Sequence, residues 1–127
     1  MKIVSAIARY LLAVVFLFFG SNLFLNFLHA PLPTGTEGQF FGALIASHYI
    51  YLIAFFQVVP ALLLLVNRYV PLGLILLAPL LVGILFVHIL MAPSGLPIAL
   101  VVILLWILAV LPVRSAFAGL LQAKVNS

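Results

Sequence analysis

Apolar positions along this chain form four long stretches rather than a regular alternation with polar ones. The stretches cover roughly residues 6–28, 48–66, 70–92 and 96–114, and each is apolar on nearly every helical face. A helix that is apolar all round is typical of a membrane span. About 20 residues, at ~1.5 Å each, cross a hydrocarbon core of ~30 Å. The pattern predicts an all-α integral membrane four-helix bundle, with residues 1–127 forming one domain.

The breaks between the stretches contain helix-breaking residues. They read HAPLPTGTEG at 29–38, NRYVP at 67–71 and APSGLP at 92–97, which are rich in proline, glycine and small polar residues. Residues 39–47, QFFGALIAS, either extend the second helix outward or lie flat at the membrane interface, and their periodicity does not decide between these. Pro60 and Pro79 lie inside the second and third helices and predict kinks, because each removes a backbone donor.

The amino-terminal segment resembles a secretory signal in its basic start and apolar run, MKIVSAIARYLLAVVFLFFG. The apolar character continues through SNLFLNFL, which is longer than a signal core, and no small-residue cleavage site follows. We therefore expect a retained first helix.

The composition agrees with a membrane protein, because 69% of the residues are hydrophobic and 5% are charged. The net charge of +4 comes from five Lys and Arg spread over the chain, without the basic run that would indicate nucleic acid as a partner. The absence of cysteine excludes disulfides and thiolate metal sites. The expected partner is the lipid bilayer.

The basic residues predict the orientation of the bundle. Loops rich in Lys and Arg face the cytoplasm, and all five basic residues fall on one side of the four predicted spans. They are Lys2, Arg9, Arg68, Arg114 and Lys124. We expect a multi-pass protein of the cell (inner) membrane with both termini cytoplasmic, in which Arg9, Arg68 and Arg114 act as topology anchors.

Polar side chains gather at the opposite, outer end of the predicted bundle. Asn22, Asn26 and His29 follow i, i+4, i+7 spacing on one face of the first helix. Polar groups within a bilayer are costly unless paired, so they are candidates for ligand binding. The alternative for His88 is a ring that hydrogen-bonds to a neighbouring helix and stabilises the bundle. The ligand-binding candidates are His88, His48, Asn22, Asn26, His29 and Glu37.

No catalytic residue and no metal ligand is predicted. With a single acid, one chain cannot supply a carboxylate pair, and there is no Ser-His-Asp arrangement or phosphate-binding loop. His48 and His88 lack spacing that would favour a pair of haem ligands, and the histidines together with Glu37 lack the spacing of recognised metal sites. No cofactor is required by the sequence, although a quinone is compatible with the polar cluster.

Several stretches resemble the DoxX-like branch of the DoxX family of small four-helix membrane proteins. They are FLFFGSNLFLNF, PLPTGTEGQFFGAL, LLLLVNRYVPLGLILLAP and VHILMAPSGLP, and the resemblance covers roughly residues 7–113. It implies a four-helix bundle with both termini inside, and some relatives are linked to quinone-coupled sulfur oxidation or to complexes that handle oxidative stress. This chain departs from the branch at Gln57 and Ala61, where many relatives carry glutamate and glycine, and at Gly83, where they carry asparagine.

Two functions remain open from the sequence. The first is a non-catalytic accessory or scaffold subunit of a membrane complex, including a redox-linked one, that associates with other membrane subunits or with itself. The alternative is a component of a quinone- or redox-linked membrane oxidoreductase with a polar site at its outer end. The missing acid at Gln57 favours the first, and the histidines favour the second.

Overall fold

The computed structural model describes residues 2–26 and 31–123, which contain helices and short connections. The prediction of an all-α protein is therefore confirmed. His29 and Lys124 lie outside the described residues. The elements are α1 (Lys2–Leu25), α2 (Gly35–Ala46), α3 (Ile50–Leu65), α4 (Val70–Leu90), the 3₁₀ segment η1 (Pro93–Gly95), α5 (Leu96–Val110) and the 3₁₀ segment η2 (Leu111–Leu121).

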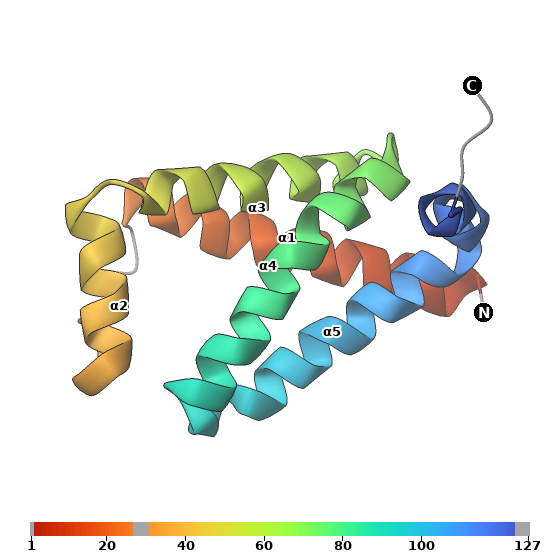
Figure 1. Cartoon of the computed structure of the whole chain (residues 1–127). Coiled ribbons are helices and arrows are strands. Elements are labelled where there is room, and N and C mark those ends of the chain that lie inside the picture. Colours follow the sequence, from red (N-terminus) through yellow and green to blue (C-terminus); the bar gives the residue numbers. More distant parts are fainter. Residues whose placement is uncertain (1, 27–30, 124–127) are drawn as a thin grey trace.

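The long helices form two antiparallel pairs (Figure 1). Helix α1 packs along α3, and α4 packs along α5, while contacts of α1 with α5 and of α3 with α4 join the pairs. The buried core lies where the four helices meet. It consists of Leu12, Ala13 and Phe16 of α1, Ala61 and Leu64 of α3, Val70, Leu74, Leu77 and Leu81 of α4, and Val102 and Ala109 of α5.

Three helical segments of the described chain are long and apolar enough to cross a membrane, namely Lys2–Leu25, Val70–Leu90 and Pro93–Leu120. Helix α3 has 16 residues, so it is about 24 Å long at ~1.5 Å per residue and falls short of a ~30 Å core. It qualifies as a fourth span only together with α2, from which it is bent by 88°. The chain is thus a multi-pass helical membrane protein with three or four candidate spans.

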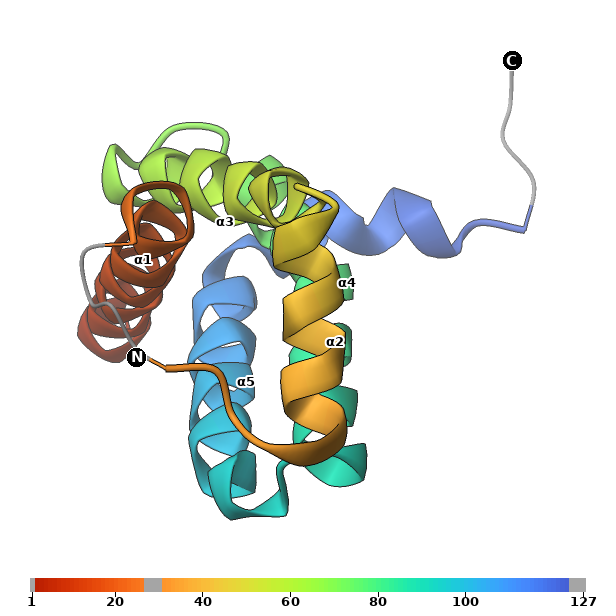
Figure 2. The same cartoon turned by 90° about the vertical axis from the view of Figure 1, so that its left-hand side faces the viewer.

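The bend between α2 and α3 is made at His48. This residue adopts a left-handed backbone with φ 65°, and its N–H donates to the carbonyl of Ile45 at 3.1 Å. Histidine is among the few non-glycine residues that adopt this conformation with any frequency. The N–H of Tyr49 then donates to the Ser47 hydroxyl at 3.3 Å. Figure 2 shows α2 turned away from α3 by this bend, so residues 39–47 are not a straight extension of the second span.

The turn between α3 and α4 has the geometry of a Schellman motif. Asn67 is left-handed with φ 57°; its N–H donates to the carbonyl of Leu64 at 3.4 Å, and the Arg68 N–H donates to that of Leu63 at 3.1 Å. These bonds satisfy carbonyls that the end of a helix leaves without partners. Pro71 follows in the first turn of α4, a position where its missing N–H is not needed.

Arg9 closes the same helix end from a distant part of the chain. Its guanidinium donates from α1 to the carbonyl of Leu64, and it lies over the ring of Tyr10 with 4.3 Å between the guanidinium carbon and the ring centroid. A cation at a helix C-terminus is favourable because of the helix dipole. Arg9 therefore joins α1 to α3, a structural role in addition to the predicted one of topology anchor.

The basic residues meet at one end of the molecule, which we call the basic end. Lys2 and Arg9 share a small cavity with Asn67 and Val113, which are chain neighbours of the exposed Arg68 and Arg114. Segment η2 contacts α1 and α4 there. The predicted gathering of basic residues on one side thus holds for the four that are described, while their assignment to the cytoplasm remains a prediction.

Candidate functional site

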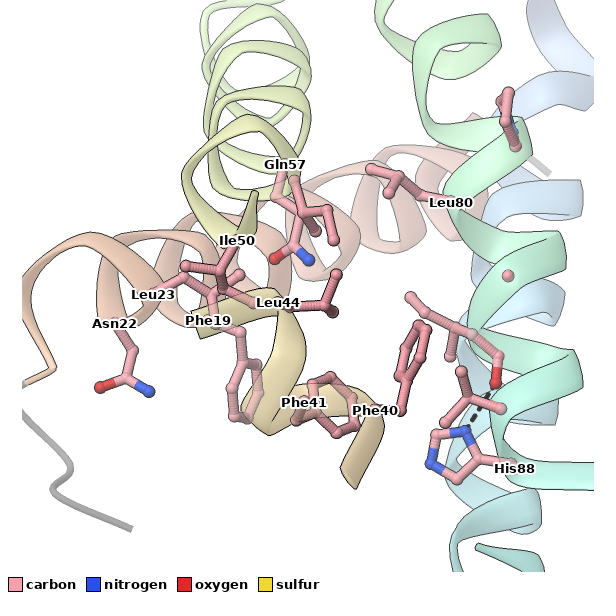
Figure 3. Close-up of a pocket in the computed structure, with 15 residues that line it drawn as sticks. Phe19, Asn22, Leu23, Phe40, Phe41, Leu44, Ile50, Gln57, Leu80 and His88 are labelled. Atoms are coloured by element: carbon pink, nitrogen blue, oxygen red, sulfur yellow. Dashed lines mark hydrogen bonds between the residues drawn. The ribbon is translucent and has the colours of Figure 1, made fainter. Parts of the chain in front are cut away.

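A large cavity lies at the end opposite the basic residues, and we call it the far-end cavity. It has a volume of about 430 Å³ and is lined by residues from the ends of α1 and α4, the start of α3 and one face of α2. Most of the lining is apolar, including Phe19, Phe40 and Phe41. Its polar side chains are Asn22, Gln57 and His88, which come from three different helices (Figure 3).

The cavity exists because α2 packs loosely. Helix α2 contains no buried residue, and it contacts α3 far less than the long helices contact one another. Two of its aromatic side chains, Phe40 and Phe41, project into the cavity and are seen in Figure 3 between Gln57 and His88. A helix with few buried contacts opens at a lower free energy than the rest of the protein, which predicts that α2 opens before the four long helices.

His88 is half-buried near the end of α4. Its Nδ1 lies 2.7 Å from the carbonyl oxygen of Ile84, and since a carbonyl oxygen only accepts, Nδ1 must carry the proton. In the neutral ring, Nε2 then holds a lone pair and is an acceptor. The partner of His88 is thus one turn back on its own helix rather than on a neighbouring helix.

Gly95 fixes the position of the His88 ring. A Cβ atom added at Gly95 would clash with the ring carbon Cδ2 and would lie 2.6 Å from Nε2. The ring therefore rests directly against the backbone of η1, in space that any larger residue would occupy. The glycine in the break APSGLP contributes to the site as well as to the turn.

Gln57 is the polar residue of the cavity whose side chain lacks a hydrogen-bond partner. Its Oε1 is buried and has no hydrogen-bond partner, the single side-chain atom of this kind in the described part of the chain. A buried polar atom without a partner costs about 1–3 kcal/mol. The start of the Gln57 side chain packs closely against α1 at Gly20, where an added Cβ would approach the Gln57 Cβ to 2.9 Å.

The predicted site residues divide between the cavity and local roles at helix ends. Asn22 and His88 line the cavity. Asn26 follows α1 with a left-handed φ of 50°. Glu37 lies in the first turn of α2, where a negative charge suits the helix dipole. The exposed His48 forms the bend between α2 and α3, and its ring stacks on that of Tyr51 with 5.8 Å between the centroids. His29 lies outside the described residues. Asn26, Glu37 and His48 do not line the far-end cavity.

Gln57 was not selected as a site residue from the sequence and was treated there only as a departure from the DoxX-like branch. The sequence signal that could have selected it is a lone amide in the middle of an apolar span, which is a functional candidate by default.

The histidines do not come together as a ligand pair, because His88 lines the far-end cavity and His48 does not. No group of three or more His, Cys, Asp or Glu side chains that could hold a metal occurs among residues 2–26 and 31–123.

The arrangement is suited to binding a small, largely apolar molecule with a polar headgroup. Sites of this kind combine an apolar, aromatic lining with a few polar groups that orient the ligand. By rotation of its amide, Gln57 can donate to a carbonyl or accept from a hydroxyl, and the neutral form of the His88 ring accepts at Nε2. His88 is the one ionisable side chain of the lining.

No family model, no curated protein and no solved structure matches this chain.

Proposed function

We propose that this chain is a non-catalytic accessory or scaffold subunit of a membrane complex, of the redox-linked kind that its resemblance to DoxX-like proteins implies. The far-end cavity is the observation that carries the proposal. Its lining offers groups that bind, but no nucleophile with an adjacent base and no pair of acids. The loosely packed α2 beside it leaves room for an apolar segment of a partner subunit.

The second candidate is a component of a quinone- or redox-linked membrane oxidoreductase that holds a quinone in the same cavity. Gln57 and His88 favour it, because the amide suits either the carbonyl of a quinone or the hydroxyl of a hydroquinone, while the His88 Nε2 suits the hydroxyl. The aromatic wall of Phe19, Phe40 and Phe41 suits a flat ring, which gains from stacked or edge contacts.

Purification in mild detergent separates the two candidates. Mass spectrometry identifies chains that copurify in fixed ratio, and solvent extraction measures quinone per folded molecule. A stoichiometric partner without quinone supports the subunit. Quinone without a partner supports the second candidate, and the absence of both contradicts the two proposals together.

A pair of histidine variants links either result to the cavity. His88→Asn removes the ring from the cavity, whereas His48→Asn makes the same change at an exposed residue outside it, at a left-handed position that asparagine tolerates. The bound partner or quinone is expected to fall in His88→Asn and to stay unchanged in His48→Asn. Equal losses in both variants would mean that the cavity is not the binding site.

The orientation with both termini in the cytoplasm belongs to the same proposal, and it rests on the gathering of basic residues at one end. The chain has no cysteine, so Thr36→Cys near the start of α2 and Ser115→Cys in η2 each introduce a single exposed thiol. Gly35 is less suitable because its φ is 76°. An impermeant thiol reagent should label position 36 and not position 115 in intact cells. The opposite pattern would reverse the orientation.

A further inference from the structure

A second cavity lies among the basic residues, between the start of α1, the α3–α4 turn and the α5–η2 junction. Its volume is about 170 Å³, and we call it the basic-end cavity. Its polar lining consists of Lys2, Ser5, Arg9 and Asn67, and the rest is apolar: Ala6, Val70, Ala109, Pro112 and Val113. None of the functions considered above uses it.

The charge of this cavity is positive and has no carboxylate opposite it. Lys2 and Arg9 contribute two cations, and the lining contains no acid. The single acid of the chain, Glu37, lies in α2 near the other end of the molecule. Helices α1 and α4 begin beside the cavity, at Lys2 and Val70, and α3 ends there at Leu65, so helix dipoles of both signs meet and the side-chain cations supply the net positive charge.

Arg9 is the donor of the cavity that the protein itself holds in position. One N–H group of Arg9 is engaged by the Leu64 carbonyl, and its guanidinium lies over the Tyr10 ring. This leaves further N–H groups of its five. Ser5 is 4% exposed and is the one polar residue that is buried as a whole among the described residues. Asn67 has a left-handed backbone in the α3–α4 turn, and its side chain is exposed. An arginine held in position with further N–H groups is suited to phosphate, which it can bind through two parallel hydrogen bonds.

We propose that the basic-end cavity binds the phosphate of an anionic phospholipid. The cavity lies where the apolar helices end, which is the level of lipid headgroups, and its apolar residues continue into the exposed apolar faces of α1 and α5. A basic pocket between transmembrane helices is a recognised chemistry for anionic headgroups. The nearby exposed Arg68 and Arg114 attract the same lipids without lining the cavity.

Native mass spectrometry of the full chain in detergent tests this proposal. The protein is titrated with phosphatidylglycerol and, in a matched control, with phosphatidylcholine that has the same acyl chains. Phosphatidylcholine keeps the phosphate but adds a cation. We expect one phosphatidylglycerol to bind with clear preference over phosphatidylcholine. Equal binding of the two lipids would overturn the proposal. Inorganic phosphate and a short polyglutamate peptide form the other arms, and tighter binding of either would mean free phosphate or an acidic protein as the ligand instead.

Two variants with equal charge loss separate a site from a general basic surface. Lys2→Gln removes an exposed cation that lines the cavity, and Arg68→Gln removes an exposed cation that does not. Lys2→Gln should weaken phosphatidylglycerol binding by about fivefold, the amount expected for one cation near an anionic surface, and Arg68→Gln should weaken it less. Ser5→Ala, which removes only the buried hydroxyl, should also weaken binding. Equal effects of Lys2→Gln and Arg68→Gln, together with no effect of Ser5→Ala, would contradict the site.

Discussion

The basic end and the far end of this molecule are built from the same apolar helices but are packed in different ways. At the basic end, α1, α3, α4 and α5 surround fully buried residues such as Leu12, Leu64 and Leu74. The basic-end cavity has a volume of about 170 Å³, whereas the far-end cavity has about 430 Å³, and α2 beside it buries no residue at all. Apolar composition alone therefore does not decide where a membrane protein is closely packed.

Polar groups show the same contrast. At the basic end they complete the helices: Arg9 binds the Leu64 carbonyl, and Asn67 makes the turn. At the far end, Gln57 leaves Oε1 buried without a partner, and His88 turns Nδ1 to its own helix, which directs the other nitrogen elsewhere. A polar group that is satisfied within the protein stabilises it, whereas a buried group left without a partner, such as the Gln57 Oε1, lowers the stability of the protein.

The largest expected difference between the two ends is in the cost of losing a leucine. Leu12→Ala empties space in the core and should lower the free energy of unfolding by about 2 kcal/mol or more. Leu44→Ala removes a half-buried side chain that already faces the cavity, so its cost should stay below about 1 kcal/mol. Unfolding in mixed micelles with increasing SDS measures both. Equal losses would mean that the two ends are packed alike.

Arg9→Gln should have the next largest effect, because it removes both the charged donor to the Leu64 carbonyl and the contact with Tyr10. A hydrogen bond to a charged group contributes about 1.5–3 kcal/mol, and we expect a loss near the lower value because Arg9 is half-buried. The same unfolding experiment measures it.

Arg68→Lys is the control for Arg9, since Arg68 is exposed at the same end and its charge is retained. It should change stability by less than about 0.5 kcal/mol. A large loss in Arg68→Lys would instead reveal a specific partner for that guanidinium, and a neutral Arg9→Gln would show that the contact with Leu64 does not hold α1 to α3.

The sequence was sufficient to predict the apolar helices and the gathering of basic residues, because both depend on local composition. The predicted segments 48–66 and 70–92 correspond to α3 (Ile50–Leu65) and α4 (Val70–Leu90). The contact of Arg9 with Leu64 joins residues 55 positions apart, and no periodicity encodes such a pair. The 88° bend depends on one backbone angle at His48, which an apolar pattern does not specify.

The candidate site was predicted only in part for the same physical reason. Asn22 and His88 were selected because polar residues in spans are rare, and they do line one cavity. Asn26 and His48 were selected by the same rule but lie at left-handed helix ends, where their side chains favour the backbone conformation. A polar residue near the end of a span therefore has two explanations, and only the backbone angle separates them.

Gln57→Leu tests the unsatisfied group at the far end. The substitution removes a buried acceptor that has no partner and keeps an apolar side chain of similar length. In protein stripped of ligand, it should therefore raise the free energy of unfolding by about 1 kcal/mol. The same variant should lose any species that binds in the cavity. A loss of stability in the stripped protein would mean that Gln57 has a partner after all.

The smallest expected effect is that of His48→Gly, which asks whether His48 serves the bend or a ligand. Glycine adopts the left-handed φ of 65° without the steric cost of a side chain, which is ~1–2 kcal/mol for an ordinary residue, but it loses more entropy on folding. The two terms nearly cancel, so stability should change by no more than about 0.5 kcal/mol. His48→Val places a β-branched side chain at the same angle and should lose about 1 kcal/mol or more. Thermal unfolding of both variants, with bound partner or quinone measured beside it, separates the two roles. If the His48 ring is needed for binding, both variants lose the bound partner or quinone. If His48 only ends α2, His48→Gly keeps the bound species, because glycine preserves the backbone angle on which the position of α2 depends.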